Sequence, residues 1–254
     1  MTWALDLDGV VWLAGRALPG AASAVETLRQ AGERVVFLTN NSGPSLAGHV
    51  EALGRTGIEC AAQDVVTSAQ AAASLLARGS RVAIVGDRGI REALAARDVE
   101  EVGAAESPDA VVVGRTLQLD YGALANAATA VRQGARFIAT NTDATFPTGG
   151  PNGGLLPGAG ALVAFVATAS GRQPEVAGKP HEPMAALVKT RFGSLSVMVG
   201  DRPDTDGLFA MRVGARFGLV LSGVTRASDL PVVPAPDRVG PDLAALVSDY
   251  LGRP

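Results

Sequence analysis

Residues 3–11, WALDLDGVV, place two carboxylates directly after a run of apolar residues. Side chains alternate along an extended chain, so Asp6 and Asp8 leave the backbone on the same side. Two such carboxylates repel each other and lose solvation unless a cation, a proton or strong donors compensate them. Gly9 lets the backbone turn sharply beside the pair. The stretch predicts a buried strand that ends in a magnesium-assisted site with a carboxylate nucleophile, and the alternative is a capped turn after such a strand.

The segments that follow predict a parallel sheet. Residues 21–28 show helical spacing of apolar side chains after Pro19 and Gly20, and residues 34–38 form a short apolar run of the buried-strand type. A strand, a helix and a second strand imply a right-handed crossover between parallel strands. Thr39 then lies at the same carboxyl edge as Asp6 and Asp8, together with Asn40 and Asn41. A helix N-cap at Asn41 or Ser42 is the alternative for those two residues.

The rest of the chain continues this alternation, so the predicted class is α/β, a Rossmann-like doubly wound parallel sheet. Strands are expected at residues 81–86, 110–114, 136–140, 195–199 and 216–220, and a long Gly- and Pro-rich loop at 145–160. The tail is expected to be mostly loop, ending in a helix near 243–250. Acidic or polar strand ends cluster at Asp6, Thr39 and Asp201, and the strands from residue 81 to residue 140 form a contiguous group between them. We therefore expect a catalytic core of residues 1–70 and 179–254 and an inserted α/β cap domain of residues 71–178.

Composition limits the function classes. The chain has 254 residues, 47% of them hydrophobic and 19% charged, so it can bury a sizeable core. A net charge of −3 gives no indication that the protein binds a nucleic acid or a membrane surface. The single cysteine, Cys60, excludes an internal disulfide framework and indicates a reducing compartment. The start MTWALDLDG has no basic region typical of a signal peptide. We expect a cytoplasmic protein.

Four separated elements fit one reaction: the Asp6/Asp8 pair, Thr39, Lys179 and the Asp201/Asp206 pair. An aspartate can attack a phosphoryl group and form an aspartyl phosphate, which divides one hard hydrolysis into two easier steps. Several carboxylates suit Mg²⁺, which prefers oxygen ligands and substrate phosphate. A lysine and a hydroxyl add donors to the phosphoryl oxygens. Each element alone is weak, since a lysine after a glycine is usually a solvated surface residue.

Together these motifs resemble the haloacid dehalogenase superfamily of phosphatases. The resemblance rests on residues 6–10 (DLDGV), 39–41 (TNN), 178–180 (GKP) and 200–206 (GDRPDTD). An insertion between the second and third motifs is similar to the class IIA subgroup, which contains 4-nitrophenyl, phosphoglycolate, pyridoxal phosphate and glycerol phosphate phosphatases. Two departures are Arg115-Thr116, where relatives have an apolar residue and an aspartate, and Gly207, where isoleucine is usual. The first bears on substrate choice.

The resemblance implies a role for each matching residue. Asp6 would be the nucleophile and Asp8 the general acid and base. The Asp6 carboxylate, the Asp8 carbonyl and the Asp201 carboxylate would bind Mg²⁺, with Asp206 supporting the metal site. The phosphoryl group would be held by these residues: Gly9, Thr39, Asn40, Asn41 and Lys179.

Rival interpretations remain at this point: a phosphomutase, a signalling module that accepts phosphate on aspartate, and an idle binding protein. The expected partner is a small phosphorylated metabolite, with no nucleic acid and no membrane, and a homodimer through the cap is implied by the resemblance. Residues 141–148 and the loop around Arg115 are expected to face the site. The repeated tetrapeptide VGDR at residues 85–88 is interpreted as a simple turn between a strand and a helix.

Overall fold

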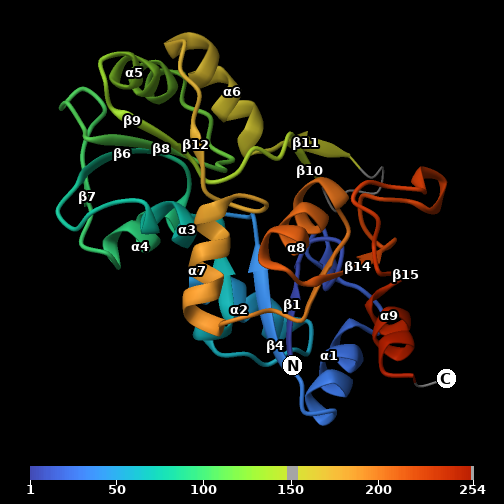
Figure 1. Cartoon of the computed structure of the whole chain (residues 1–254). Coiled ribbons are helices and arrows are strands. Elements are labelled where there is room, and N and C mark those ends of the chain that lie inside the picture. The colour runs from blue at the N-terminus through green and yellow to red at the C-terminus, as the bar shows by residue number, and fades with distance from the viewer. Residues whose placement is uncertain (148–153, 253–254) are drawn as a thin grey trace.

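A computed structural model describes residues 1–147 and 154–252, which contain two parallel sheets (Figure 1). The first sheet has the strand order β15-β14-β13-β1-β4-β5. Its strands are β1 (Thr2–Leu5), β4 (Arg34–Thr39), β5 (Val65–Thr67), β13 (Val197–Gly200), β14 (Arg216–Val220) and β15 (Arg238–Gly240). The chain runs outward from β1 in one direction through β4 and β5, and in the other through β13, β14 and β15. The point where the order reverses, beside β1, is where open α/β sheets bind ligands.

Side chains alternate between the two faces of the first sheet, and both faces carry apolar side chains. Helices therefore cover both faces. Trp3, Leu5 and Phe37 pack with α1 (Ala21–Gln30) and α9 (Leu243–Tyr250). Ala4 and Val36 belong to a cluster on the opposite face, with residues of α3 (Ser68–Ser74), α7 (Glu182–Phe192) and α8 (Leu208–Val213). The α2 helix (Leu46–Arg55) begins at Ser45, whose side chain accepts a hydrogen bond from the backbone of Gly48. This three-layer arrangement confirms the predicted α/β class.

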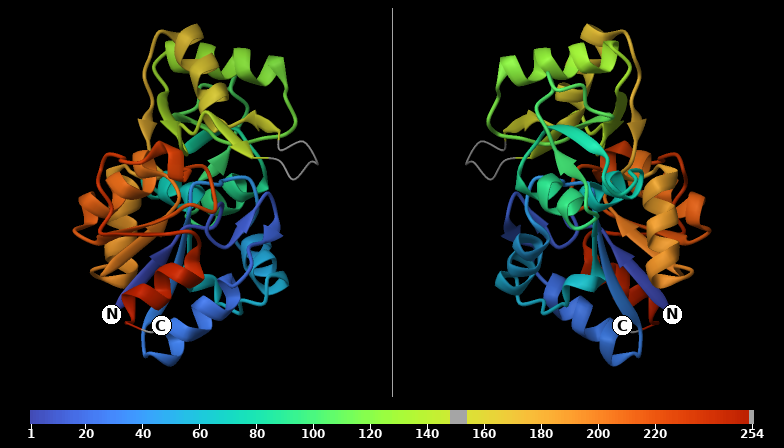
Figure 2. Two further views of the ribbon diagram at one scale, coloured as in Figure 1. Left: turned by 90° about the vertical axis from the view of Figure 1, so that its right-hand side faces the viewer. Right: turned by 90° about the vertical axis from the view of Figure 1, so that its left-hand side faces the viewer.

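The second sheet is formed by residues that lie between β5 and β13 in the chain. Its order is β12-β9-β8-β6-β7, all parallel. Its strands are β6 (Arg81–Val85), β7 (Glu100–Glu101), β8 (Ala110–Val113), β9 (Arg136–Ala139) and β12 (Glu175–Val176). One face packs on α5 (Tyr121–Arg132) and α6 (Ala159–Ser170), and the other on α4 (Arg88–Ala95) and the alanines of α3. Figures 1 and 2 place this sheet at one end of the molecule and the first sheet at the other. We refer to residues 81–176 as the insert.

Two short hairpins project toward the boundary between the sheets. One joins β2 (Trp12–Leu13) to β3 (Arg16–Ala17). The other pairs β10 (Thr145–Pro147) with β11 (Leu155–Pro157), so the long loop predicted over 145–160 is wrong for these residues. Residues 148–153 of that prediction, including Thr148, lie outside the described residues.

Three edge strands were not anticipated. The tail contains β15, and the insert has β7 and β12 at its two edges. Each has two or three residues, which is too short to give the alternation by which strands are recognised.

Among the described residues, no helix has both the length and the apolar character needed to cross a membrane.

Candidate active site

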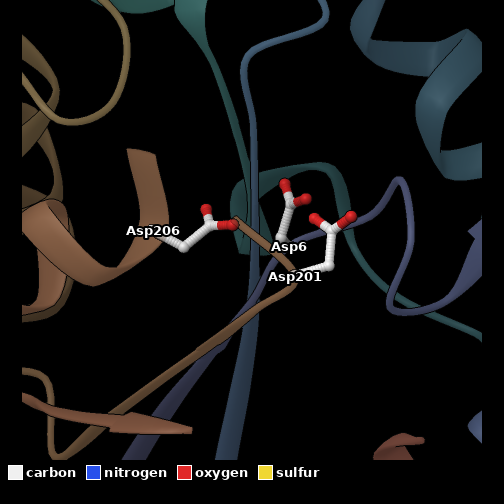
Figure 3. A group of neighbouring side chains, drawn as sticks. All are labelled: Asp6, Asp201 and Asp206. Carbon is white, nitrogen blue, oxygen red and sulfur yellow. The ribbon is translucent and has the colours of Figure 1, made fainter. Parts of the chain in front are cut away.

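Three carboxylates converge at the carboxyl edge of the first sheet (Figure 3). Asp6 follows β1, Asp201 follows β13, and Asp206 lies in a π-helical turn, Pro203–Gly207. One oxygen of each carboxylate lies within 4.8 Å of the others, and all three residues are buried. The π-helical turn returns Asp206 toward the strand end it follows, and such local departures from α-helix geometry are frequent at functional sites. The sequence-predicted acids of two separate motifs therefore form one cluster.

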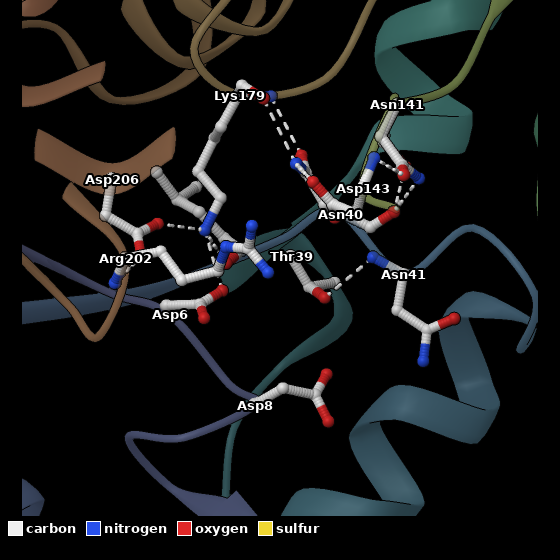
Figure 4. Close-up of polar contacts among 12 residues, drawn as sticks. Asp6, Asp8, Thr39, Asn40, Asn41, Asn141, Asp143, Lys179, Arg202 and Asp206 are labelled. Atoms are coloured by element: carbon white, nitrogen blue, oxygen red, sulfur yellow. Dashed lines mark hydrogen bonds and ion pairs between the residues drawn. The ribbon is translucent and has the colours of Figure 1, made fainter. Parts of the chain in front are cut away.

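Lys179 lies among these carboxylates (Figure 4). Its Nζ donates to Asp6 Oδ1 at 2.6 Å and to Asp206 Oδ1 at 2.7 Å. A third bond, of 3.2 Å, goes to the carbonyl of Leu38 at the end of β4. Burial lowers the pKa of Lys179, but the two carboxylates outweigh burial and the pKa is raised overall. The ammonium is therefore charged at neutral pH, and it holds Asp6 and Asp206 at fixed positions.

Burial is the main cause of the shifted pKa values of the acids. It raises the pKa of Asp6 well above its ordinary value, and the charge of Lys179 opposes this increase. It also raises the pKa of Asp201 to about 7, with a further increase from the charge of Asp206. Oδ2 of Asp201 accepts a 2.6 Å hydrogen bond from the backbone N–H of Val224, whereas Oδ1 is buried with no partner among the described residues. A bound cation would satisfy that oxygen and favour the ionised forms.

Gly9 permits this close approach. It has φ +87°, a conformation that favours glycine, and a Cβ at this position would overlap the carboxylate of Asp201. The oxygen-only donor set, with the unpartnered Asp201 Oδ1, fits a hard divalent cation such as Mg²⁺.

Asp8 lies apart from the lysine and is held by a different partner. Its Oδ1 accepts a 3.0 Å hydrogen bond from Nε1 of Trp12 on the β2–β3 hairpin. Burial raises the pKa of Asp8, while the bond from Trp12 and the charge of Arg115 oppose the increase. A carboxyl with a raised pKa is suited to donate a proton to a departing oxygen and to accept one later. The sequence does not reveal this contact, because an indole N–H has no sequence pattern that identifies its acceptor.

The polar residues at the end of β4 are held in place by bonds within the protein (Figure 4). The Asn40 side chain accepts from the backbone N–H of Lys179 at 2.8 Å and donates to its carbonyl at 3.1 Å. Thr39 Oγ1 accepts from the backbone N–H of Asn41 at 3.0 Å, which leaves the Thr39 hydroxyl proton free to donate to an anion. The Asn40 side chain thus positions Lys179.

One pocket joins these groups to the insert. From the first sheet it is lined by Asp6, Asp8, Gly9, Thr39, Asn40, Asn41, Lys179 and Asp201, and from the insert by Arg115, Asn141, Asp143, Thr145, Phe146 and Pro147. Asp206 lies behind Lys179 and does not line the pocket. These insert residues are among those expected around Arg115 and residues 141–148, and Gly158 and Ala159 of the insert also line the pocket. Val224 was not singled out from the sequence, although it follows the carboxyl end of β14.

Comparisons with known proteins agree with this geometry. The family model described as haloacid dehalogenase-like hydrolase matches residues 3–100, and a second, HAD-hydrolase-like, matches residues 176–246. The D-glycerol 3-phosphate phosphatase of Mycobacterium tuberculosis is 40% identical, over 96% of this chain and 70% of its own length. The 4-nitrophenylphosphatase of Schizosaccharomyces pombe is 31% identical, over 90% of this chain and 88% of its own.

A solved structure of the M. tuberculosis glycerol phosphate phosphatase in complex with magnesium superposes with a TM-score of 0.87 at 38% identity. The match covers 96% of this chain and 75% of that structure. The chain belongs to the haloacid dehalogenase-like hydrolases, within the class IIA phosphatases.

Proposed function

We propose that this protein is a Mg²⁺-dependent phosphatase that hydrolyses small phosphate monoesters through an aspartyl phosphate on Asp6. The observation on which the proposal rests is the buried cluster of Asp6, Lys179, Asp201 and Asp206 at the base of a pocket that also contains Asp8. A nucleophilic carboxylate, a fixed ammonium and a separate carboxyl of raised pKa are the groups that the two-step hydrolysis requires.

In the first step, a carboxylate oxygen of Asp6 attacks phosphorus. The bond from phosphorus to the leaving oxygen breaks as the bond to Asp6 forms, and Asp8 donates its proton to that leaving oxygen. In the second step, a water oxygen attacks the phosphorus of the aspartyl phosphate, Asp8 takes the water's proton, and the bond to Asp6 breaks. Throughout, the positive charge of Lys179 and the hydroxyl of Thr39 stabilise the phosphoryl oxygens, where charge accumulates in the transition state.

Mg²⁺ would be held by the carboxylates of Asp6 and Asp201 and by the main-chain carbonyl of Asp8. It would supply charge neutralisation and orientation of the phosphoryl group. The unpartnered Oδ1 of Asp201 supports this assignment, as does the magnesium complex of the M. tuberculosis relative. Asp206 would act through Lys179 and the turn, since its oxygens bond Lys179 and the N–H of Arg202.

The proposal extends to the arrangement of the chain. Residues 71–178 would be a cap over a catalytic core of residues 1–70 and 179–254, and would exclude water and select the leaving group. The insert's share of the pocket lining supports this division. A cytoplasmic location and a homodimer through the cap belong to the same proposal.

The experiment is phosphate release from a panel of small monoesters, with Mg²⁺ and with EDTA, for the wild type, Asp6→Asn and Asp87→Asn. Asp87 is a half-buried aspartate outside this pocket and serves as the matched control. Mg²⁺-dependent release that only Asp6→Asn abolishes is expected. A stable phosphoprotein without turnover, or an isomerised ester without free phosphate, would overturn the hydrolase proposal in favour of a signalling module or a mutase.

A further inference from the structure

Arg115 is the part of the pocket that the proposed hydrolysis does not use. It follows the carboxyl end of β8, in the insert, and it lines the same pocket as Asp6 and Asp8. The phosphoryl group is expected against Lys179 and Thr39, at the base formed by the first sheet. A cation on the insert side therefore faces the space left for the leaving group.

Three contacts fix the position of Arg115. Its backbone N–H donates to Ser42 Oγ at 3.2 Å, and its Nη1 donates to Asn41 Oδ1 at 3.2 Å. The guanidinium carbon lies 4.3 Å from the centroid of the Phe146 ring on the β10–β11 hairpin. A stacked, hydrogen-bonded guanidinium has already lost much of its side-chain entropy, so ordering it on a ligand costs little.

Most of the hydrogen-bond donors of the Arg115 guanidinium have no acceptor among the described residues. One of its five N–H donors has an acceptor among the described residues, and Nε is buried with no partner there. No carboxylate in the described part of the chain forms an ion pair with it within 4.0 Å. Arg202, which also lines the pocket, differs in this respect, since it is paired with Asp204 at 3.1 Å.

We propose that Arg115 binds a second anionic group on the leaving group, a carboxylate or a second phosphate, and so selects phosphate esters whose leaving group carries such an anion. The inference rests on the proposed phosphatase function. A guanidinium fork matches both anions and can bond either through two parallel N–H groups. The four aspartates that line the pocket, Asp6, Asp8, Asp143 and Asp201, would repel a second anion unless a cation faces it.

The test uses ester pairs that differ only in the second anion. These are 2-phosphoglycolate against 2-hydroxyethyl phosphate, 3-phosphoglycerate against glycerol 3-phosphate, and fructose 1,6-bisphosphate against fructose 1-phosphate. Each pair is assayed with the wild type, Arg115→Met, Arg115→Lys and the control Arg88→Met, an exposed arginine outside the pocket. The first two pairs test a carboxylate and the third tests a second phosphate. If Arg115→Met fails to fold, Arg115→Gln, which can keep the bond to Asn41, replaces it.

For wild type, kcat/KM is expected to favour the member with the second anionic group in at least one pair. Arg115→Met should lower kcat/KM for that member by about 10- to 100-fold, mainly through KM, and leave the member without the second anionic group within about threefold. Arg115→Lys should fall between, and Arg88→Met should match wild type.

An equal loss on both members of every pair would overturn the inference and make Arg115 a residue that only positions Asn41 or tunes Asp8. A shift of the pH profile common to all esters would have the same meaning. Because the inference rests on the hydrolase proposal, a wild type that releases no phosphate from any ester overturns both. Release without any preference for the members that carry a second anionic group overturns the role of Arg115 alone.

Discussion

The tetrapeptide Val-Gly-Asp-Arg occurs twice in this chain, and the two copies have different structural surroundings. Residues 85–88 end β6 and residues 199–202 end β13, so both aspartates follow parallel strands. Asp87 is the N-cap residue of α4, which begins at once with Arg88, and it is half-buried. Asp201 is 1% exposed and is followed by the π-helical turn that brings Asp206 back to it.

The difference lies in the neighbours of each strand end. One neighbour of β13 is β1, which contributes Asp6, so Asp6 and Asp201 meet, and Lys179 forms an ion pair with Asp6. The strand beside β6 is β8, which contributes Arg115, and the backbone N–H of Asp87 donates to its carbonyl at 3.1 Å. The same four residues therefore form an acidic site in one sheet and a helix start in the other. The position of a strand in its sheet decides the chemistry of its end.

The largest expected difference between the copies is in activity. Asp201→Asn removes a carboxylate of the metal site and should lower Mg²⁺-dependent phosphate release by about 100- to 1,000-fold, because the cation stabilises the transition state by several kcal/mol. Asp87→Asn should stay within about twofold of wild type, because surface changes away from a site have small effects. Initial rates over a Mg²⁺ titration measure both. Similar losses of activity in the two variants would contradict the assignment of Asp201, and not Asp87, to the metal site.

Two basic residues should differ in their effect on stability: Lys179, which is buried near the second copy, and Arg88, which is the exposed last residue of the first copy. Lys179→Met leaves Asp6 and Asp206 buried without their partner and should cost about 3–5 kcal/mol of unfolding free energy. Arg88→Met removes an exposed charge and should change it by less than about 0.5 kcal/mol. Urea unfolding followed by circular dichroism gives both values. A Lys179→Met midpoint equal to that of wild type would contradict the buried ion-pair cluster.

Metal-free protein should lose stability as the pH rises. The pKa of Asp201 is about 7 in the folded protein, against 3.8 as the ordinary value. Between these pH values the unfolded chain releases the proton that the folded protein still holds, so unfolding becomes easier with rising pH. The contribution is about 4 kcal/mol at most, present in full below about pH 4 and lost above about pH 7.

Unfolding of the protein in EDTA, at several pH values between about 4 and 8, measures this slope. Asp201→Asn should make the slope smaller, because the raised pKa values of Asp6 and Asp8 then remain. Asp87→Asn should leave the slope unchanged, and Mg²⁺ should restore stability at the higher pH values. A wild-type curve that rises over this range would contradict the prediction.

The sequence predicted most of this comparison because strand ends can be read locally. The apolar runs before Asp6, Thr39 and Asp201 identify buried strands, and parallel strands present their carboxyl ends at one edge. The interpretation of residues 85–88 as a turn before a helix agrees with the Asp87 N-cap geometry. The α/β class followed from the same alternation of strands and helices.

What could not be predicted depends on contacts between distant segments. The bond from Trp12 to Asp8, the bonds between Asn40 and Lys179, and the bond from Val224 to Asp201 join residues that no spacing rule links. The β10–β11 hairpin was missed because its strands have three residues each and include prolines, which typically mark loops.

The smallest expected difference concerns the glycines of the two copies. At Gly200, an added Cβ would overlap the side chain of Asp206, including its Cβ, which is anchored to the backbone of the π-helical turn. At Gly86, the added atom would meet the tip of the Ile90 side chain, Cδ1, which can rotate away. Gly200→Ala should therefore cost about 1–3 kcal/mol of unfolding free energy, as overpacking of a buried site does, and Gly86→Ala less than about 1 kcal/mol.

Unfolding of the two variants in the same buffer measures these costs, and phosphate release shows whether the turn has moved. Because the Gly200 overlap displaces Asp206, Gly200→Ala should also lower activity through Lys179, which Asp206 holds. Gly86→Ala should keep full activity. If Gly200→Ala were destabilised yet fully active, the turn could move without disturbing Lys179. Asp206 would then support the fold and not the position of the lysine, and the difference between the two copies would lie in Asp201 and Asp6.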